Sequence, residues 1–347
     1  MTLVSKLAVQ NMRAHDSFVI KLSPSVTVIT GANGSGKTSL IEALYVALRG
    51  SSFKGSDKEI LKQTTDWWRI DVGFDDTSSR SVKFDPAKTS GKKQFVLNHK
   101  TSYRLSEKDK LPVVLFEPED LRLLHGSPAR RRLFIDRFIA QIDPHYALAL
   151  RRYERALKQR NTLLKLDGSA DDLFAWNISL SDYGSYIMER RVQFIEQINK
   201  SLNDEYQTIA KNNDAVSIHY SHTVIGDQKT RLLGELEQHM SRDRILGYTS
   251  VGPHRHDVSF VFNGASALSV ASRGEARTIV LALKFIESDM VANLTGINPL
   301  MLLDDVFSEL DEDRQLALTK LMGKQIVITS TSISGYEDEY VYRLPAK

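Results

Sequence analysis

The segment GANGSGKT, residues 31–38, has the residue types and the spacing of a phosphate-binding loop. It fits the pattern G-x-x-x-x-G-K-[ST], in which glycines allow backbone N–H groups to curl around phosphate oxygens. In such a loop the lysine, here Lys37, reaches the β- and γ-phosphates, and the hydroxyl of Thr38 is a Mg²⁺ ligand. The segment therefore predicts that ATP and Mg²⁺ bind to Gly31, Ala32, Asn33, Gly34, Ser35, Gly36, Lys37, Thr38 and Ser39.

A β-rich run and a helical run flank this loop. The run SVTVIT ends at residue 30, and residues 37–49 place Leu40, Leu44 and Leu48 on one helical stripe. A strand before the loop and a helix after it would hold the phosphates at the positive end of the helix. A chance glycine-rich turn is the alternative, and the two flanking elements make it the weaker one.

A second pair of reactive side chains ends the apolar run PLMLLDD, residues 299–305. A buried strand that ends in a carboxylate can deliver a Mg²⁺ ligand to a phosphate-binding loop, and Asp304 is the candidate. Asp305 comes next, so along a strand its side chain would point to the other side, where it could polarise the attacking water as a general base. The alternative is that both carboxylates merely cap the following loop.

The rest of the chain predicts one α/β domain that is interrupted by helices. Strand candidates between residues 67 and 116 are separated by turns and indicate a β-meander. Residues 143–166 and about 173–210 have helical patterns, with the break DGSADD between them. These two helices predict an antiparallel arm, although a plain helical bundle fits the pattern equally well.

Strands and helices alternate again in the last hundred residues, where KQIVITS is the last clear strand candidate. The two ends of the chain therefore predict one α/β head, built from residues 1–135 and 246–347. Residues 136–245 would form an inserted helical domain, a short coiled-coil arm.

The stretch ASRGEAR, residues 271–277, leads into an apolar helix. Upstream of a strand that ends in paired acids, it resembles the signature motif of ABC-type ATPases, and SELD, residues 308–311, resembles their D-loop. In that family the signature of one subunit closes over the ATP that the P-loop of the other subunit holds. The resemblance implies an ABC-type P-loop ATPase head that dimerises on ATP, with Ser272, Gly274 and Asp311 at the nucleotide of the partner chain. The alternative is that Ser272 only caps the helix.

Two further segments narrow the resemblance. Residues 113–136 and TSVGPHRHD, residues 249–257, are similar to the RecF family of bacterial recombination mediators, and the opening segment LAVQNMRAHDSFVI resembles the SMC-like DNA-repair branch. This resemblance implies a slow ATPase that binds duplex DNA and single/double-strand junctions, and that works with RecR and RecO to load recombinase at gaps. It also implies that Arg13 contacts the nucleotide, and that Lys37, Asp305 and Ser272 contribute to hydrolysis.

Other SMC-like or ABC-type ATPases are the alternative. A transporter subunit predicts a glutamine-rich signature and a histidine after the last core strand, whereas this chain has Arg273 and Glu275 in the signature and Ser330 or Thr331 after the strand. A nuclease-associated head needs a separate acidic metal-binding domain, for which the chain has no room.

The charge of the chain is nearly balanced, because 46 Lys and Arg residues face 43 Asp and Glu residues. DNA binding must then come from local patches that contact phosphates without reading sequence. Three of the candidate lysines share one face if residues 54–62 are helical, and a solvated surface is the alternative for each cluster. The candidate DNA contacts are Lys54, Lys58, Lys62, Arg151 and Arg152.

The absence of cysteine excludes a disulfide framework, a thiolate metal site and a cysteine nucleophile. The first residues lack the pattern of a signal peptide, and no apolar run approaches the length of about 18 residues that spans a membrane. We therefore expect a soluble, cytoplasmic protein without a membrane partner.

Overall fold

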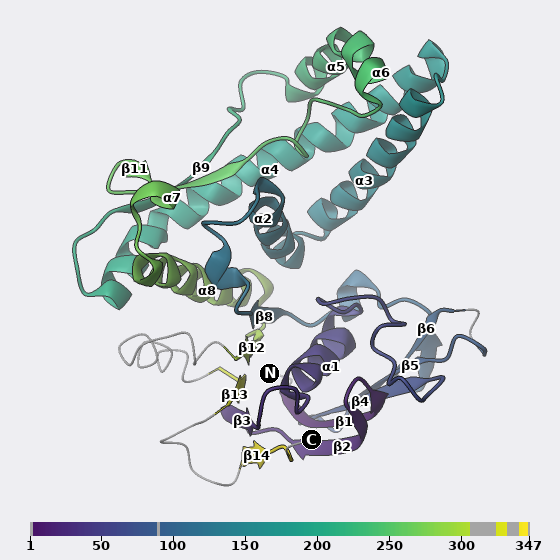
Figure 1. Ribbon diagram of the computed structural model, residues 1–347, viewed down its shortest axis with the longest axis vertical. Helices are drawn as coiled ribbons and strands as arrows, with labels where there is room; N and C mark the ends of the chain where they lie inside the picture. The colour runs from purple at the N-terminus through teal and green to yellow at the C-terminus, as the bar shows by residue number, and fades with distance from the viewer. Residues whose placement is uncertain (1–2, 89–90, 306–323, 332–339, 346–347) are drawn as a thin grey trace. The chain divides into compact units, whose positions relative to one another are not determined.

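The computed structural model describes residues 3–88, 91–305, 324–331 and 340–345 (Figure 1). The chain divides into two compact units, unit 1 (Met1–Asp120 with Glu287–Lys347) and unit 2 (Leu121–Ile286), and we describe each by itself. Both chain ends thus belong to unit 1. The domain bounds expected from the sequence, 136–245 for the arm, differ from these compact units and stay a prediction about functional domains.

Unit 1 contains an antiparallel sheet of six strands in the order β2-β1-β4-β5-β6-β7. Along β4 the side chains of Trp68, Ile70, Val72 and Phe74 are buried and the residues between them are more exposed, which matches a sheet with one face on a core. The predicted β-meander is confirmed for residues 68–102, whereas the last strand candidate, at residues 113–116, belongs to the parallel sheet. The strands are β1 (Val4–Met12), β2 (His15–Lys21), β4 (Trp68–Phe74), β5 (Ser79–Phe84), β6 (Lys93–Leu97) and β7 (Lys100–Ser102).

The second sheet of unit 1 is parallel and has the order β14-β3-β13-β12-β8. Its central strands are buried along most of their length, as parallel strands covered on both faces are. Its strands come from both halves of the chain, so residues far apart in sequence meet at the carboxyl edge of the sheet, where ligands bind in α/β folds. They are β3 (Val26–Thr30), β8 (Val113–Phe116), β12 (Leu300–Asp304), β13 (Ile326–Ser330) and β14 (Val341–Arg343).

Helix α1 (Lys37–Arg49) contacts strands of both sheets. It is buried on nearly all sides, because apolar residues such as Ile41, Leu44 and Ala47 follow one another around the helix. Gly50 ends α1 in the left-handed conformation, with a φ of 90°. A helix packed so completely is a rigid support for the loop that precedes it.

Residues 54–62 are not a helix, although a helix here was the condition for placing the three lysines on one face. They form bends and turns, and Leu61 pairs with Met12 of β1. The Ser52 hydroxyl accepts hydrogen bonds from the backbone N–H groups of Lys54 and Gly55, which ties down the start of the segment. The condition for a common helical face of Lys54, Lys58 and Lys62 is therefore not met, and their contact with DNA stays a prediction.

Unit 2 contains the predicted helical arm, in which α3 and α4 run antiparallel and are joined by a short turn (Figure 1). Proline follows an N-cap residue at the start of α2 and α3, where its missing N–H costs nothing. The helices are α2 (Pro128–Ile142), α3 (Pro144–Lys165), α4 (Ala170–Ala210), α5 (Gln228–Gln238), α6 (Met240–Leu246), α7 (Ala267–Val270) and the first part of α8 (Arg273–Thr295), whose residues from Glu287 onward belong to unit 1. A small sheet has the order β11-β10-β9, with β9 (Val216–Tyr220), β10 (Val258–Phe262) and β11 (Ala265–Ser266). Among the described residues, 3-10 turns form at η1 (Glu107–Asp109), which belongs to unit 1, and at η2 (Asp120–Arg122), where unit 1 meets unit 2 in the sequence.

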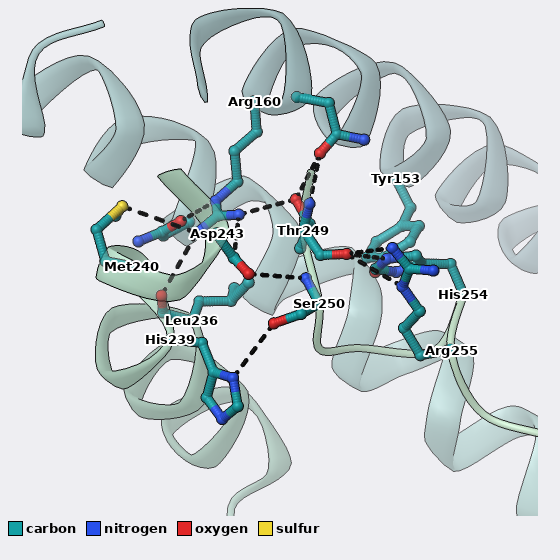
Figure 2. Close-up of polar contacts among 12 residues, drawn as sticks. Tyr153, Arg160, Leu236, His239, Met240, Asp243, Thr249, Ser250, His254 and Arg255 are labelled. Carbon is teal, nitrogen blue, oxygen red and sulfur yellow. Dashed lines mark hydrogen bonds and ion pairs between the residues drawn. The ribbon is translucent and has the colours of Figure 1, made fainter. Parts of the chain in front are cut away.

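A fully buried ion pair ties α3 to α6 within the arm. Arg160 donates to Oδ2 of Asp243 at 2.7 Å, and neither side chain is exposed to solvent. The same guanidinium donates to the hydroxyl of Thr249 at 2.8 Å (Figure 2). It also donates to Oδ1 of Asn177 on α4 at 2.7 Å. Arg160 thus joins three helices and the segment TSVGPHRHD, a contact set that the sequence did not reveal.

Replacing Arg160 by Met is expected to destabilise unit 2 by about 3–5 kcal/mol, because Asp243 would stay buried without its charge partner. Urea unfolding, followed by circular dichroism, measures the loss. Arg244→Met is the matched control. Arg244 pairs with Asp167, whose side chain is 91% exposed, so that change should cost below about 1 kcal/mol. Equal losses in the two variants would contradict the structural role of Arg160.

Candidate nucleotide-binding site

The phosphate-binding loop connects β3 to α1 as the sequence predicted. Gly36 has a φ of 99°, in the left-handed region that favours glycine. A Cβ at this position would lie 2.4 Å from Nε2 of His15, which itself forms a hydrogen bond of 3.1 Å with the carbonyl oxygen of Gly36. Gly34 also has a left-handed φ, of 81°, and open space around it. Backbone conformation and a close neighbour therefore both require glycine at position 36.

Lys37 folds back over this loop from the first turn of α1. Its ammonium donates to the carbonyl oxygens of Gly31, at 2.7 Å, and Ala32, at 3.2 Å. Lys37 is only 6% exposed, so its ammonium is held in one position and is largely shielded from solvent. A fixed cation at the N-terminal end of a helix is the arrangement that binds phosphate.

Thr38 and Asp304 lie together, although they are far apart in sequence. The Thr38 hydroxyl donates to Oδ1 of Asp304 at 2.8 Å, and the hydroxyl of Thr329 on β13 donates to the same oxygen at 3.0 Å. Asp304 is the last residue of β12 and is 2% exposed. A hydroxyl and a carboxylate on one edge are the donor set that Mg²⁺ takes from a protein while phosphates supply further oxygens.

Asp305 does not continue the strand. β12 ends at Asp304, and Asp305 has a left-handed backbone with a φ of 53°. Its N–H donates to the hydroxyl of Thr329 at 2.9 Å and to the Thr329 carbonyl oxygen at 3.2 Å. The strand alternation that we used to orient this side chain therefore does not apply, and its role as general base stays a prediction.

Arg13 is engaged by a carboxylate of α1. Its guanidinium forms two hydrogen bonds with Glu42, at 3.0 and 2.9 Å, and Glu42 is 1% exposed. The hydrogen bonds that Arg13 donates to the Glu42 carboxylate raise the pKa of Arg13. The residue that we expected to contact the nucleotide thus neutralises a buried acid beside the loop. Glu42, an acid within an apolar helical run, was the sequence signal for this pair.

The signature segment lies in unit 2, at the start of α8. The Ser272 N–H donates to Oε2 of Glu275 at 2.6 Å, and the Glu275 N–H donates to the Ser272 hydroxyl at 3.2 Å. This reciprocal pair is a capping box, the local role that we had weighed as the alternative. Ser272 is exposed, and an exposed helix N-terminus can also receive phosphate. Asp311 and the rest of SELD lie outside the described residues.

Arg131 and Arg132 contact the segment TSVGPHRHD within unit 2. Arg131 forms two hydrogen bonds with Asp257, at 3.0 and 2.7 Å, and Arg132 donates to the carbonyl oxygen of His256 at 2.7 Å. Burial lowers the pKa of His256 to about 3, so its ring is neutral at pH 7. The two segments that carry the RecF resemblance, residues 113–136 and 249–257, therefore contact each other through these arginines.

The candidate DNA contacts are divided between the two units, with Lys54, Lys58 and Lys62 in unit 1 and Arg151 and Arg152 in unit 2. Lys54 faces Asp304, with Nζ 3.5 Å from Oδ2, and Lys62 pairs with Asp16. Lys58 is exposed. On α3, Arg151 and Arg152 are exposed, and Arg152 also lies over the ring of Tyr183.

Within the described part of the chain, no group of three or more His, Cys, Asp or Glu side chains is placed to hold a metal ion. The Thr38–Asp304 pair stays the candidate metal site, and it would need phosphate oxygens to complete it. Among the same residues, no helix combines the length and the apolar character needed to cross a membrane.

The chain is similar in sequence to known proteins over most of its length. Residues 6–242 match the family model described as an AAA domain. The chain is 36% identical to the DNA replication and repair protein RecF of Streptococcus pyogenes serotype M4 (strain MGAS10750), over 95% of this chain and 92% of that protein. A RecF of Streptococcus pyogenes serotype M1 is 35% identical over the same shares.

Solved structures give the same result. The structure of the recombination mediator protein RecF-ATP in the RecFOR pathway is similar over 99% of this chain and 95% of that chain, with a TM-score of 0.87 and 29% identity. An Smc head domain from Pyrococcus furiosus, at 16% identity and a TM-score of 0.54, shares the fold. The chain belongs to the RecF family, and its fold is that of an ABC-type P-loop ATPase head.

Proposed function

We propose that this protein is an ATP-dependent, DNA-binding recombination mediator of the cytoplasm. It dimerises on ATP, binds duplex or gapped DNA, and helps to load recombinase at single-strand gaps together with RecR- and RecO-like partners. The observation that carries the nucleotide part is the hydroxyl of Thr38 at 2.8 Å from the buried carboxylate of Asp304, beside the fixed ammonium of Lys37. Membership of the RecF family supports the DNA-repair part.

The residues present fit ATP and Mg²⁺. Thr38 and Asp304 would hold the metal, which supplies charge neutralisation at the phosphates when it is bound. Lys37 would bind the β- and γ-phosphates, and the loop Gly31–Ser39 would surround them with N–H groups. Asp305 would take the proton of the attacking water in a slow hydrolysis reaction.

A homodimer would complete this site. In a two-fold dimer each chain presents the same surface, so each nucleotide would take its P-loop from one chain and its signature from the other. Ser272, Gly274 and Asp311 would then act on the partner's ATP. ATP that contacts both chains binds the dimer more tightly than it binds the single chain, and it therefore favours the dimer. Hydrolysis would open the dimer and release DNA.

DNA would lie on the joined surface and be held through its phosphates. Such contacts weaken as salt rises and do not distinguish sequences. Lys58 and the arm arginines Arg151 and Arg152 are exposed, so they are the first positions to test, followed by Lys62 and Lys54.

Ser272→Arg tests the shared site. The variant is expected to bind ATP in its own P-loop yet neither dimerise nor hydrolyse ATP, because the arginine would occupy the space of the partner's phosphate. In a mixture with Lys37→Met, each mixed dimer has one doubly defective site and one intact site. With random mixing, about half of the dimers are mixed, so roughly a quarter of all sites should regain ATPase activity.

Steady-state ATPase assays and gel filtration, with each variant alone and then mixed, give the readout. Each variant alone should be inactive, and activity should recover on mixing. Normal dimerisation and ATPase activity of Ser272→Arg alone would show that the segment 271–277 only caps α8 and would sink the shared-site proposal.

A further inference from the structure

Lys54 lies beside the candidate metal ligand, in a position that the nucleotide-binding motifs do not explain. Its Nζ is 3.5 Å from Oδ2 of Asp304, and the two side chains are 39% and 3% exposed. The hydroxyls of Thr38 and Thr329 both donate to the other oxygen, Oδ1. Neutral donors therefore hold one carboxylate oxygen, while a full positive charge faces the second.

The segment that carries Lys54 is fixed on α1. The Ser52 hydroxyl donates to Oε1 of Glu42 at 2.5 Å and accepts a hydrogen bond from the Lys54 N–H at 2.9 Å. The ring of Phe53 packs edge-on against Tyr45, with 5.3 Å between ring centroids, and the Lys54 ammonium lies 5.8 Å from the Phe53 centroid. Because Glu42 is itself held by Arg13, a chain of contacts leads from the opening motif to the metal ligand.

This chain of contacts gives Arg13 and Ser52 a physical role. They hold the backbone from which the lysine reaches Asp304, so they are positioning residues. A carboxylate as buried as Asp304 is stabilised by a nearby cation. A divalent metal would use the same carboxylate, and two cations so close together repel each other.

We infer that Lys54 is the counter-ion of Asp304, and that Mg²⁺ must displace it when nucleotide binds. The inference rests on the proposed function, in which Asp304 binds the metal that accompanies ATP. Metal binding and release of Lys54 are then linked, and the linkage is reciprocal, because whatever removes the ammonium from Asp304 raises the affinity for Mg²⁺. Lys54 acts at the nucleotide site and sets the Mg²⁺ concentration at which the site fills.

Nucleotide binding as a function of Mg²⁺ concentration tests this role without relying on hydrolysis. The full chain is mixed with a fluorescent ATP analogue at fixed concentration, and Mg²⁺ is titrated. Lys54→Gln is expected to lower the Mg²⁺ midpoint by about three- to tenfold, since a competing charge is removed from a partly exposed position. Lys54→Arg keeps the charge and should keep the midpoint near that of the unaltered chain.

Lys100→Gln is the matched control, because Lys100 is an exposed lysine of unit 1, on β7. It should leave the midpoint unchanged. In an Asp304→Asn background, Lys54→Gln should no longer lower the midpoint, since its partner has lost its charge. Thermal unfolding of each variant verifies that the fold is retained.

An unchanged or raised midpoint in Lys54→Gln, with normal unfolding, would overturn the inference. A raised midpoint would mean that the lysine assists nucleotide binding rather than opposing the metal. Failure of the proposed function has a different signature, because then the unaltered chain itself would bind the analogue weakly and without dependence on Mg²⁺. The two failures are thus separated in one set of titrations.

Discussion

Lys37→Met is expected to abolish ATP-driven dimerisation while the fold is retained. The change removes a charge-assisted contact with phosphate of about 1.5–3 kcal/mol, which corresponds to a loss of roughly ten- to 150-fold in ATP affinity. Methionine keeps the apolar stem of the side chain, and Gly34 and Gly36 keep the loop conformation, so unfolding should change little. At this reduced affinity, too few of the sites hold ATP for the nucleotide to join two chains.

Gel filtration with light scattering, with and without ATP and Mg²⁺, measures dimerisation, and the fluorescent analogue measures binding. Lys100→Met provides a control with the same change of residue type at an exposed position of unit 1. The P-loop assignment fails if Lys37→Met dimerises fully with ATP.

Asp305→Asn is expected to lose about 10²–10⁴ of the ATPase turnover while ATP binding and dimerisation persist. The amide cannot accept the proton of the attacking water. Asparagine tolerates the left-handed backbone that Asp305 adopts, with its φ of 53°, so the local structure should survive the substitution. The dimer should be long-lived, because nothing opens it.

A single-turnover assay, together with gel filtration on ATP, separates chemistry from binding. Asp304→Asn is the comparison, since it should weaken nucleotide binding and alter its Mg²⁺ dependence rather than leave a stable ATP dimer. Normal hydrolysis by Asp305→Asn with a lower unfolding temperature would show instead that Asp305 is a cap of the turn after β12.

Local patterns in the sequence were sufficient for most of the elements and for the core of the site. The P-loop, the stripe of leucines in α1 and the capped starts of α2 and α3 depend on neighbours within a few residues, so spacing reveals them. Asp304 was predictable because an apolar run that ends in a carboxylate is also a local pattern. The family resemblance, confirmed at 36% identity, came from several such segments in order.

Residues 54–62 show where local spacing fails. Three lysines four residues apart suggested one face of a helix. Instead, Leu61 pairs with Met12 of β1, and the Ser52 hydroxyl accepts a hydrogen bond from the Lys54 N–H at the start of the segment. These contacts depend on the position of β1, which cannot be predicted from the spacing of residues within 54–62. The strand alternation that we applied to Asp305 failed for a related reason, since β12 had already ended at Asp304.

The sequence by itself thus determined the chemistry that this protein carries: a phosphate-binding loop, a carboxylate at the end of a strand and an acid beside it. Only the tertiary structure decided which groups surround that chemistry. The parallel sheet places β13 between β3 and β12, which brings Thr329 to Asp304, and the segment after α1 brings Lys54 to the same carboxylate. Partners of this kind are separated by tens to hundreds of residues, and their meeting follows from strand order and packing rather than from any periodicity of the chain.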